Sequence, residues 1–469
     1  MVWGLWTASV LLGWWEKYMK LWQKHWKLNT QVDAFETGDD LLLDQKLVWA
    51  DVVGTLAHAM MLHKIGLLSK KELIQATKGL LTIQKLDHES KFVLSIGDED
   101  VHTKIENYLT DHIGLVGKKI HTGRSRNDQV LTALRLFTKQ ELFTIWQGIV
   151  DLADAFLSFS KQYEYLPMPG YTHMQKAMPS SVGMWVASFV ESLLDDCVSL
   201  KTAITLVDQS PLGSAAGYGV PLVLDRDYTA KLLGFSKVQK NSLYCQNSRG
   251  KIEGVVVASL VSIMQTINKF ATDILLFTTS EFGYFTVADE LTTGSSIMPQ
   301  KKNIDVAELL RSKLHVILGH YNAIIGITGN LPLGYNRDFQ DTKKPLMEAL
   351  AVSKQSIAVA KLLVTHLKPN TEKLLAAMTP ELFATHKALE QVKQGKTFRD
   401  AYQAVTWNDV PSSVQVQKML KQSVHLGGTG SLGLSALQKE VAAEHNISLK
   451  AKKKFTAAMA GLGVVPYEN

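Results

Sequence analysis

The sequence predicts an all-α protein, with three mostly helical domains built around a long central helix bundle. Three observations carry this prediction. All twelve prolines lie beyond residue 166, so nothing in the first third of the chain has to interrupt a helix. Apolar residues recur at spacings of three and four over long stretches. The alternation of apolar and polar residues that is typical of strands is scarce.

Three stretches have the strongest helical period. The first runs from Leu142 to Phe159 through Ile145, Ile149, Leu152 and Phe156, and the second runs from Ile252 to Phe277. Residues 345–366, rich in Ala, Leu and Lys, form the third. Stripes of this length describe long helices packed in a bundle. The turn-rich residues 209–225 are the one plausible place for irregular structure.

The helix expected at 250–278 is apolar on more than one face, since Val255, Val257, Val261, Leu275 and Leu276 lie off its main stripe. A helix that is apolar nearly all round is buried on all sides, which indicates that subunits share this bundle. The domains are expected to divide at the Gly-Arg-Ser-Arg loop near 124 and after Pro369. The prediction is an N-terminal helical domain at 1–124, a central bundle and tetramerisation domain at 125–374, and a C-terminal helical domain at 375–469.

Composition narrows the classes of function. The formal net charge of +6 is small for 469 residues, and the lysines are scattered, which disfavours nucleic-acid binding but allows a local cationic pocket for an acidic small molecule. The only cysteines, Cys197 and Cys245, form neither a disulfide framework nor a metal motif. This cysteine usage favours a reducing, cytoplasmic location.

The start of the chain is apolar for about fifteen residues, but it lacks a basic n-region and is too short to span a bilayer. An extra segment packed on the fold, or a misassigned start codon, explains it better than a signal peptide does. The most apolar later stretch, 254–277, contains Gln265, Asn268, Lys269 and Asp273. No membrane partner is therefore expected.

Three polar loops interrupt the helical pattern, namely HTGRSRNDQV at 121–130, MPGYTHMQKAMP at 168–179 and GSSIMPQKKN at 294–303. Each loop has a purely structural interpretation when taken alone. Asn127 or Asp128 would be the N-cap of a helix, His173 a structural histidine, and Ser295 a turn residue. Folding rarely requires three such loops in one helical protein, so together they indicate a site that binds anions and moves protons.

The third loop resembles the Gly-Ser-Ser-x-Met-x-x-Lys-x-Asn signature of the fumarase/aspartase superfamily. The variant with Pro299-Gln300-Lys301-Lys302 is typical of the argininosuccinate lyase family. The other two loops are similar to the first and second conserved regions of that family, and the resemblance covers the chain from about Leu21 to the C-terminal domain. It implies a fumarase/aspartase-like fold and the reversible elimination of argininosuccinate to L-arginine and fumarate, with no metal or organic cofactor.

The resemblance also implies roles for four residues. Ser295 matches the catalytic serine, His173 the catalytic histidine, Glu308 its carboxylate partner, and Lys301 a cation that stabilises the dianionic intermediate. Donors aimed at developing charge are worth about 3–4 kcal/mol each in comparable oxyanion sites. We favour Ser295 as the group that removes the proton and His173 as the group that serves the leaving nitrogen, directly or through water. The reverse assignment stays open.

Substrate positioning is implied for residues that carry hydroxyl, amide or ammonium groups, namely Thr55, Asn127, Thr172, Asn303, Tyr335, Gln340 and Lys343. The resemblance further implies a homotetramer whose active sites are each assembled from three subunits. This agrees with the all-round apolar stretch at 250–278.

The chain departs from the family pattern in several places. Gln23-Lys24-His25-Trp26 stands where many members have Gly-Gly-Arg-Phe, Thr55 replaces a serine, and Ile304 replaces a proline. Thr342-Lys343-Lys344 replaces an acidic-Lys-Glu pattern, and 246–250 reads Gln-Asn-Ser-Arg-Gly where an acidic version is common. Two alternatives stay open from sequence. One is another superfamily lyase, such as adenylosuccinate lyase, aspartase or fumarase, and the other is an inactive structural protein like some delta-crystallins.

Overall fold

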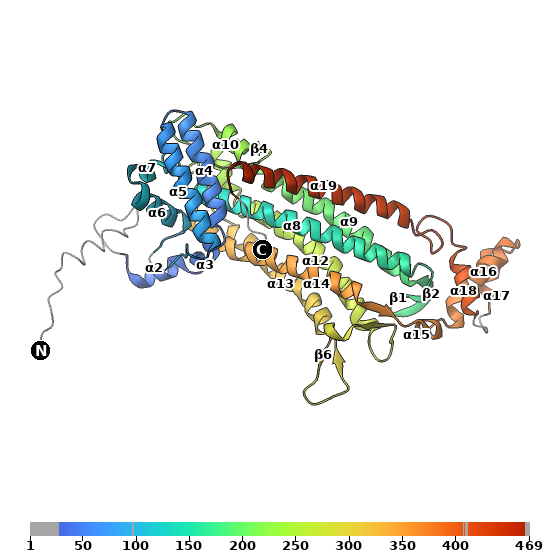
Figure 1. Ribbon diagram of the computed structural model, residues 1–469. Helices are drawn as coiled ribbons and strands as arrows, with labels where there is room; N and C mark the ends of the chain where they lie inside the picture. The colour runs from blue at the N-terminus through green and yellow to red at the C-terminus, as the bar shows by residue number, and fades with distance from the viewer. Residues whose placement is uncertain (1–27, 96–97, 407, 409–410, 465–469) are drawn as a thin grey trace, which may run out of the picture.

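The computed structural model describes residues 28–95, 98–406, 408 and 411–464. The described chain is mostly helical and elongated, with a helical group at one end, long helices through the middle and a small helical group at the other end (Figure 1). This confirms the predicted all-α class. The apolar N-terminal residues 1–19 and the segment 23–26 lie outside the described residues.

The N-terminal group is built on a hairpin of two helices, α4 (Val48–Lys64) and α5 (Lys70–His88), with Ser69 and Glu72 forming a capping box at the start of α5. Helix α4 is buried along most of its length because it packs between α5 and the bundle helix α8 (Arg126–Gln162). The members of this group are α2 (Thr30–Thr37), α3 (Asp40–Gln45), α4 (Val48–Lys64), α5 (Lys70–His88), α6 (Val101–Ile113) and α7 (Leu115–Lys119).

The three long helices expected from periodicity are all present as helices of the central bundle. At a rise of 1.5 Å per residue, the 37 residues of α8 extend about 55 Å, which makes it the longest described helix. The bundle consists of α8 (Arg126–Gln162), α9 (Val182–Val207), α12 (Lys251–Phe277), α13 (Asp305–Thr328), α14 (Lys343–Thr365) and α19 (Leu434–Gly461). Helix α19 returns along α8 and α9 (Figure 1).

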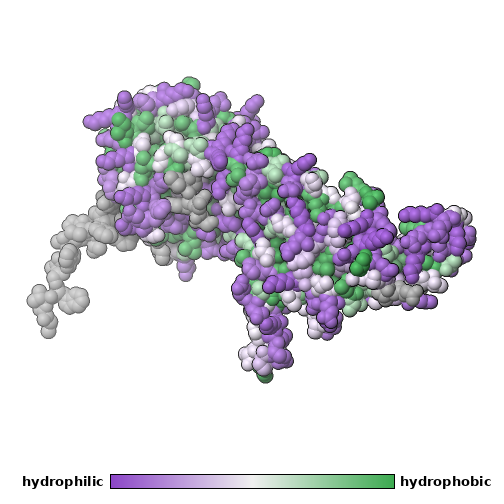
Figure 2. Space-filling model, turned by 45° about the vertical axis from the view of Figure 1, so that its right-hand side comes forward, coloured by the Kyte–Doolittle hydropathy of each residue, from purple (hydrophilic) through white to green (hydrophobic). Residues whose placement is uncertain are grey.

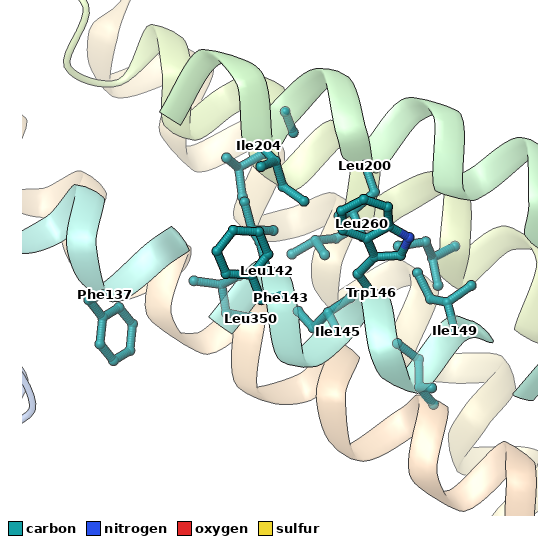
Figure 3. Packing of buried hydrophobic residues seen from close by; sticks show 14 of the residues in the cluster. Phe137, Leu142, Phe143, Ile145, Trp146, Ile149, Leu200, Ile204, Leu260 and Leu350 are labelled. Atoms are coloured by element: carbon teal, nitrogen blue, oxygen red, sulfur yellow. The ribbon is translucent and has the colours of Figure 1, made fainter. Parts of the chain in front are cut away.

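Large apolar side chains fill the space between the bundle helices. Figure 3 shows Trp146 and Leu142 of α8 among side chains from neighbouring helices, including Leu200 and Leu260. Further along, the rings of Phe156 and Phe270 meet edge to face with centroids 4.8 Å apart. Each fully buried side chain of this size contributes roughly 1.5–3 kcal/mol, so this seam holds α8, α9 and α12 together.

Helix α12 is covered mainly by helices of its own chain, because α9, α13 and α14 pack around it. Its all-round apolar sequence is therefore largely explained within one chain. Helix α13 is more open, since Leu309, Val316 and Ile325 are 58%, 41% and 44% exposed. Helix α8 and the stretch Ser242–Phe277 are long and apolar enough to cross a membrane by composition alone, but 61% of the most apolar window of each is buried within the protein.

The strands among the described residues are short and form four two-stranded ladders. Two are hairpins that matter for the site: β1 (Pro167–Thr172) with β2 (Gln175–Ser181), and β6 (Thr293–Gly294) with β7 (Lys302–Asn303). The parallel pair β3 (Gln209–Ser210) and β4 (Lys237–Val238) belongs to the region expected to be irregular. The fourth ladder is antiparallel and joins β5 (Phe285–Val287) to β8 (Leu367–Pro369).

Short elements complete the described chain. Those between the bundle helices are α10 (Arg226–Leu232), α11 (Ser242–Asn247), η2 (Asp289–Leu291) and η3 (Arg337–Thr342). Those of the far group are α15 (Thr371–Ala376), η4 (Pro380–Phe383), α16 (Ala384–Lys393), α17 (Phe398–Ala404) and α18 (Ser413–Leu420). The far group has its own small core around Phe383 and Leu420. The division into domains at 124 and 374 stays a prediction.

Candidate active site

A polar cavity of about 470 Å³ opens where the N-terminal helices meet the start of the bundle. Its wall combines α2, α3, the start of α6, the loop before α8, and the segment between α13 and α14. It is lined by Glu36, Thr37, Asp40, Asp44, Glu99, Asp100, His102, Thr103, Glu106, His121, Arg124, Ser125, Arg126, Asn127, Gln129, Val130, Arg249, Tyr335, Arg337, Gln340 and Lys343. Charged side chains of both signs dominate this wall.

Four of the predicted substrate-binding residues, Asn127, Tyr335, Gln340 and Lys343, line this cavity together. Gln340 is fixed by the hydrogen bond that its Nε2 donates to the carbonyl of Glu36, 2.8 Å away. Asn127 lies in the first turn of α8. The cavity thus brings together residues that lie more than 200 positions apart in the sequence.

Lys343 is buried at the start of α14, and its Nζ lies 2.6 Å from Asp44 Oδ1 and 3.0 Å from Asp40 Oδ1. Burial opposes the charge on Lys343, but the two carboxylates outweigh it and raise the pKa of the ammonium. Lys343 is therefore a cation at neutral pH. Burial raises the pKa of Asp40 in turn, against the influence of Lys343.

The loop before α8 ends in a capping box that involves Ser125 and Asp128. The hydroxyl of Ser125 accepts from the N–H of Asn127, and the Ser125 N–H donates to Asp128 Oδ1 at 2.9 Å. The expected N-cap, Asn127 or Asp128, is thus replaced by Ser125, because Asp128 sits at the third helical position. The second oxygen of Asp128 accepts from the N–H groups of Gly213 and Ala215, which joins this loop to the irregular 209–225 segment.

Thr55 lies beneath the cavity on α4, where it is buried and accepts a hydrogen bond of 2.9 Å from Arg124 Nη1. A smaller cavity here is lined by Thr55, Arg124, Asp51 and His102. Asp51 Oδ1 and His102 Nδ1 are 3.0 Å apart and both side chains are buried. Burial opposes the charge on His102, but the Asp51 carboxylate raises the pKa of the ring, so the two form a charged pair under the site. Thr55 does not line the large cavity itself but holds Arg124, which does.

Several wall residues were not singled out from sequence. Arg126 pairs with Glu99 and, through Nε at 2.9 Å, with Asp100. His121 faces Glu106 at 3.6 Å, and burial together with Arg124 lowers the pKa of His121 to about 4. The acidic and histidine-bearing stretch 98–106 was the available signal, but only the fold shows that it faces the loop at 121–130.

The predicted residues Thr172 and His173 lie on the β1–β2 hairpin at the opposite end of the bundle (Figure 1). Thr172 pairs with Gln175, so His173 and Met174 form a two-residue turn. Both have left-handed backbones, with φ of 53° and 61°. Non-glycine residues adopt this conformation at an energetic cost, and such strain concentrates at functional sites. His173 is exposed at the tip.

The predicted residues Ser295, Lys301, Asn303 and Glu308 occupy a third place. The first three belong to the β6–β7 hairpin, which projects from the side of the molecule, and Glu308 lies in the first turn of α13 (Figure 1). The hydroxyl of Ser295 accepts from the N–H of Met298 at 3.1 Å. Lys301 is exposed and Ser295 is half-buried. The space-filling view shows mixed hydrophilic and hydrophobic side chains over the face that it presents (Figure 2).

One chain therefore holds the predicted residues in three separate places. Asn127 at the start of α8 and His173 just beyond its end are separated by the length of that helix, about 55 Å. The catalytic and binding roles of all these residues stay predictions.

Comparison with known proteins identifies the family. A family model described as Lyase matches residues 17–319. An argininosuccinate lyase from Thermotoga neapolitana is 42% identical over 386 residues, which covers 82% of this chain and 97% of that protein. An argininosuccinate lyase from Phocaeicola vulgatus is 40% identical over 433 residues, which covers 92% of this chain and 97% of that protein.

The fold is similar to a solved structure of EDDS lyase in complex with formate, with a TM-score of 0.75, 20% identity, and coverage of 93% of this chain and 95% of that one. This likeness confirms the fumarase/aspartase-like fold and no more than that. The two relatives confirm the resemblance found in the three loops. The chain belongs to the argininosuccinate lyase family.

Proposed function

We propose that this protein is an argininosuccinate lyase of arginine biosynthesis, which cleaves argininosuccinate reversibly to L-arginine and fumarate in the cytoplasm. The support is the family membership together with a cavity whose wall carries charges of both signs. Argininosuccinate itself carries three carboxylates, an ammonium and a guanidinium. A wall of paired and unpaired charges is suited to such a ligand, since charge complementarity gives specificity.

The reaction needs a base and an acid on either side of one carbon–carbon bond of the succinate part. The base takes a proton from the carbon next to a carboxylate, and the carbon–nitrogen bond then breaks as the double bond of fumarate forms. The leaving guanidine nitrogen gains a proton, so arginine departs as a guanidinium. We assign the first proton transfer to Ser295 and the second to His173, with Lys301 and Asn303 stabilising the dianionic intermediate and Glu308 supporting His173.

The arrangement of the site across subunits rests on the length of α8. Because that helix separates Asn127 from His173 by about 55 Å, the two residues cannot meet one substrate within one chain. We therefore propose a homotetramer in which each site takes the cavity group from one subunit, the β1–β2 hairpin from a second and the β6–β7 hairpin from a third. The exposed apolar side chains of α13 support this assembly.

The direct test is release of fumarate from argininosuccinate by the purified protein, followed by ultraviolet absorbance. We expect turnover with argininosuccinate and none with adenylosuccinate, aspartate or malate. Turnover with one of the other substrates would assign the chain to another lyase of the superfamily. A tetramer that binds argininosuccinate without releasing fumarate would make it a structural protein. Activity that survives exhaustive chelation would agree with a reaction that needs no metal.

Mixed variants test the sharing of sites between subunits. Ser295→Ala and Lys343→Met chains should each be nearly inactive, because each lacks one part of every site. When the two are unfolded together and refolded, random assembly gives about one quarter of sites with both residues intact. Recovery of about a quarter of wild-type turnover is expected in the mixture. An inactive mixture that contains well-formed tetramers would show that Ser295 and Lys343 act from the same chain.

A further inference from the structure

Most cations in the cavity wall are already paired with carboxylates of the same chain. Arg126 pairs with Glu99 and Asp100, and Lys343 pairs with Asp40 and Asp44. These pairs leave little free charge with which to bind the carboxylate of a ligand. A cation that lacks such a partner is therefore informative.

Arg249 is such a cation. Its side chain lines the cavity although the residue is only 3% exposed. Within residues 28–95, 98–406, 408 and 411–464, no carboxylate lies at ion-pair distance from its guanidinium, and its Nε is buried without a hydrogen-bond partner. The guanidinium lies 5.8 Å from the ring centroid of Tyr335, one of the predicted substrate-binding residues.

The backbone around Arg249 is held in place on both sides. The N–H of Arg249 donates to the carbonyl of Gln246 at 3.1 Å. The hydroxyl of Ser248 accepts from Arg135 Nη2 of α8 at 2.7 Å. Asn247 Oδ1 accepts from the N–H of Gly334 at 2.9 Å, which ties this segment to the loop that carries Tyr335. Arg249 is thus presented to the cavity by a segment with a fixed position.

A buried guanidinium with no carboxylate at ion-pair distance is costly, and an anionic ligand would relieve that cost through a charge-assisted, bidentate contact. The surroundings of Arg249 are of mixed sign, because it acts electrostatically on the carboxyls of Asp40 and Glu253, although neither lies at ion-pair distance. Lys343 contacts Oδ1 of Asp40, and within the described part of the chain no group binds its Oδ2. A cation without an ion-pair partner and a carboxylate with a free oxygen, both in the wall of one cavity, match the head group of an α-amino acid.

We propose that Arg249 binds the α-carboxylate of the arginine half of argininosuccinate, with Asp40 facing its α-ammonium group. This inference rests on the proposed function and deepens it, since it makes Arg249 the residue that selects an α-amino acid over a simple guanidine. Arg249 lies in the segment 246–250, where the chain departs from the usual acidic pattern.

The test compares two ligands that differ only in the carboxylate, L-arginine and agmatine, by isothermal titration of the intact assembly. Wild-type protein should prefer arginine. In Arg249→Gln the affinity for arginine should fall about 10- to 100-fold, as expected for a lost charge-assisted contact, while that for agmatine stays within about twofold. Arg249→Lys should keep part of the preference. The KM for argininosuccinate should rise more than kcat falls.

Three outcomes would overturn the inference. Equal weakening of both ligands in Arg249→Gln would mean that the residue only supports the fold. An unchanged preference for arginine would place the carboxylate elsewhere, and a wild-type protein that does not prefer arginine would remove the basis of the idea. Arg399→Gln, on an exposed turn of α17, serves as the control and should change neither affinity. Fumarate release by the wild-type protein, measured separately, decides the proposed function independently.

Discussion

The two-residue turn at His173 and Met174 shows how a single side chain is presented for chemistry. Both residues adopt left-handed backbones that glycine or asparagine would adopt at less cost. The hairpin therefore holds His173 at the exposed tip in a backbone conformation that histidine does not favour by itself. This agrees with a residue that is selected for reactivity.

The turn makes His173→Asn a clean test, because asparagine tolerates this backbone and keeps the hairpin intact. We expect a large loss of kcat, smaller than that of Ser295→Ala, and an altered pH dependence of kcat/KM, since a proton carrier has been removed. Circular dichroism and sedimentation should show an unchanged assembly. A variant whose pH–rate profile matches that of the wild type would argue against proton transfer by His173.

His121 gives a prediction about stability and pH. Its native pKa of about 4 lies below the ordinary value of 6.5, since burial and Arg124 disfavour the charged ring. The unfolded chain therefore binds a proton more readily between pH 6.5 and 4, and stability must fall as pH falls through that window. His121→Asn should flatten the decline of Tm from pH 7 to pH 4. Parallel curves for the two proteins would show that His121 contributes nothing to it.

Four of the residues predicted from sequence line the cavity, their roles still being predictions, and the rest of the wall was not predictable for a physical reason. Tyr335, Gln340 and Lys343 were found because they lie close together in one motif. Their partners were not, because the contact between Lys343 and Asp44 spans 299 positions. Arg249 is not identifiable from sequence, because its significance lies in the lack of an ion-pair partner, which only its surroundings in the fold reveal.

At the scale of elements, the long helices were predictable because burial along one stripe leaves a period in the sequence. Both ends of such helices were less predictable. At the start of α8, Ser125, Asn127 and Asp128 are all good capping residues, and the fold selects Ser125 because Asp128 is also needed by Gly213 and Ala215. Several neighbouring residues could therefore cap α8 equally well by their local chemistry, and contacts with residues distant in sequence determine which one does.

The start of α12 yields a prediction of its own. Gly250 has a φ of +78°, and a Cβ there would lie 2.1 Å from Cγ2 of Thr328 at the end of α13. Gly250→Ala should therefore destabilise the protein by about 2 kcal/mol or more, through strain and overpacking. Gly461→Ala is the matched control, since open space surrounds that position, and it should be neutral or slightly stabilising. Equal Tm values for the two variants would contradict this account.

At the scale of the whole molecule, α13 leaves three large apolar side chains exposed, those of Leu309, Val316 and Ile325. Substituting Val316 and Ile325 by Asp should place charges in the proposed subunit contact, at a desolvation cost of several kcal/mol. We expect dissociation in sedimentation velocity experiments and loss of fumarate release. Leu115→Asp, at the exposed start of α7, should leave both unchanged. A tetramer that survives the double substitution would place the interface elsewhere.

The fixed length of α8 limits which mutations the sequence can accept in evolution. On the proposed arrangement its two ends serve two different catalytic centres, so the helix sets the spacing between neighbouring centres in the assembly. Inserting or deleting even one residue would turn one end by about 100° and shift it by about 1.5 Å relative to the other. Helix α8 should therefore tolerate substitutions on its exposed turns but not the insertion or deletion of a residue. The number of residues between 126 and 162 should therefore be conserved in evolution as strongly as the side chains of the sites.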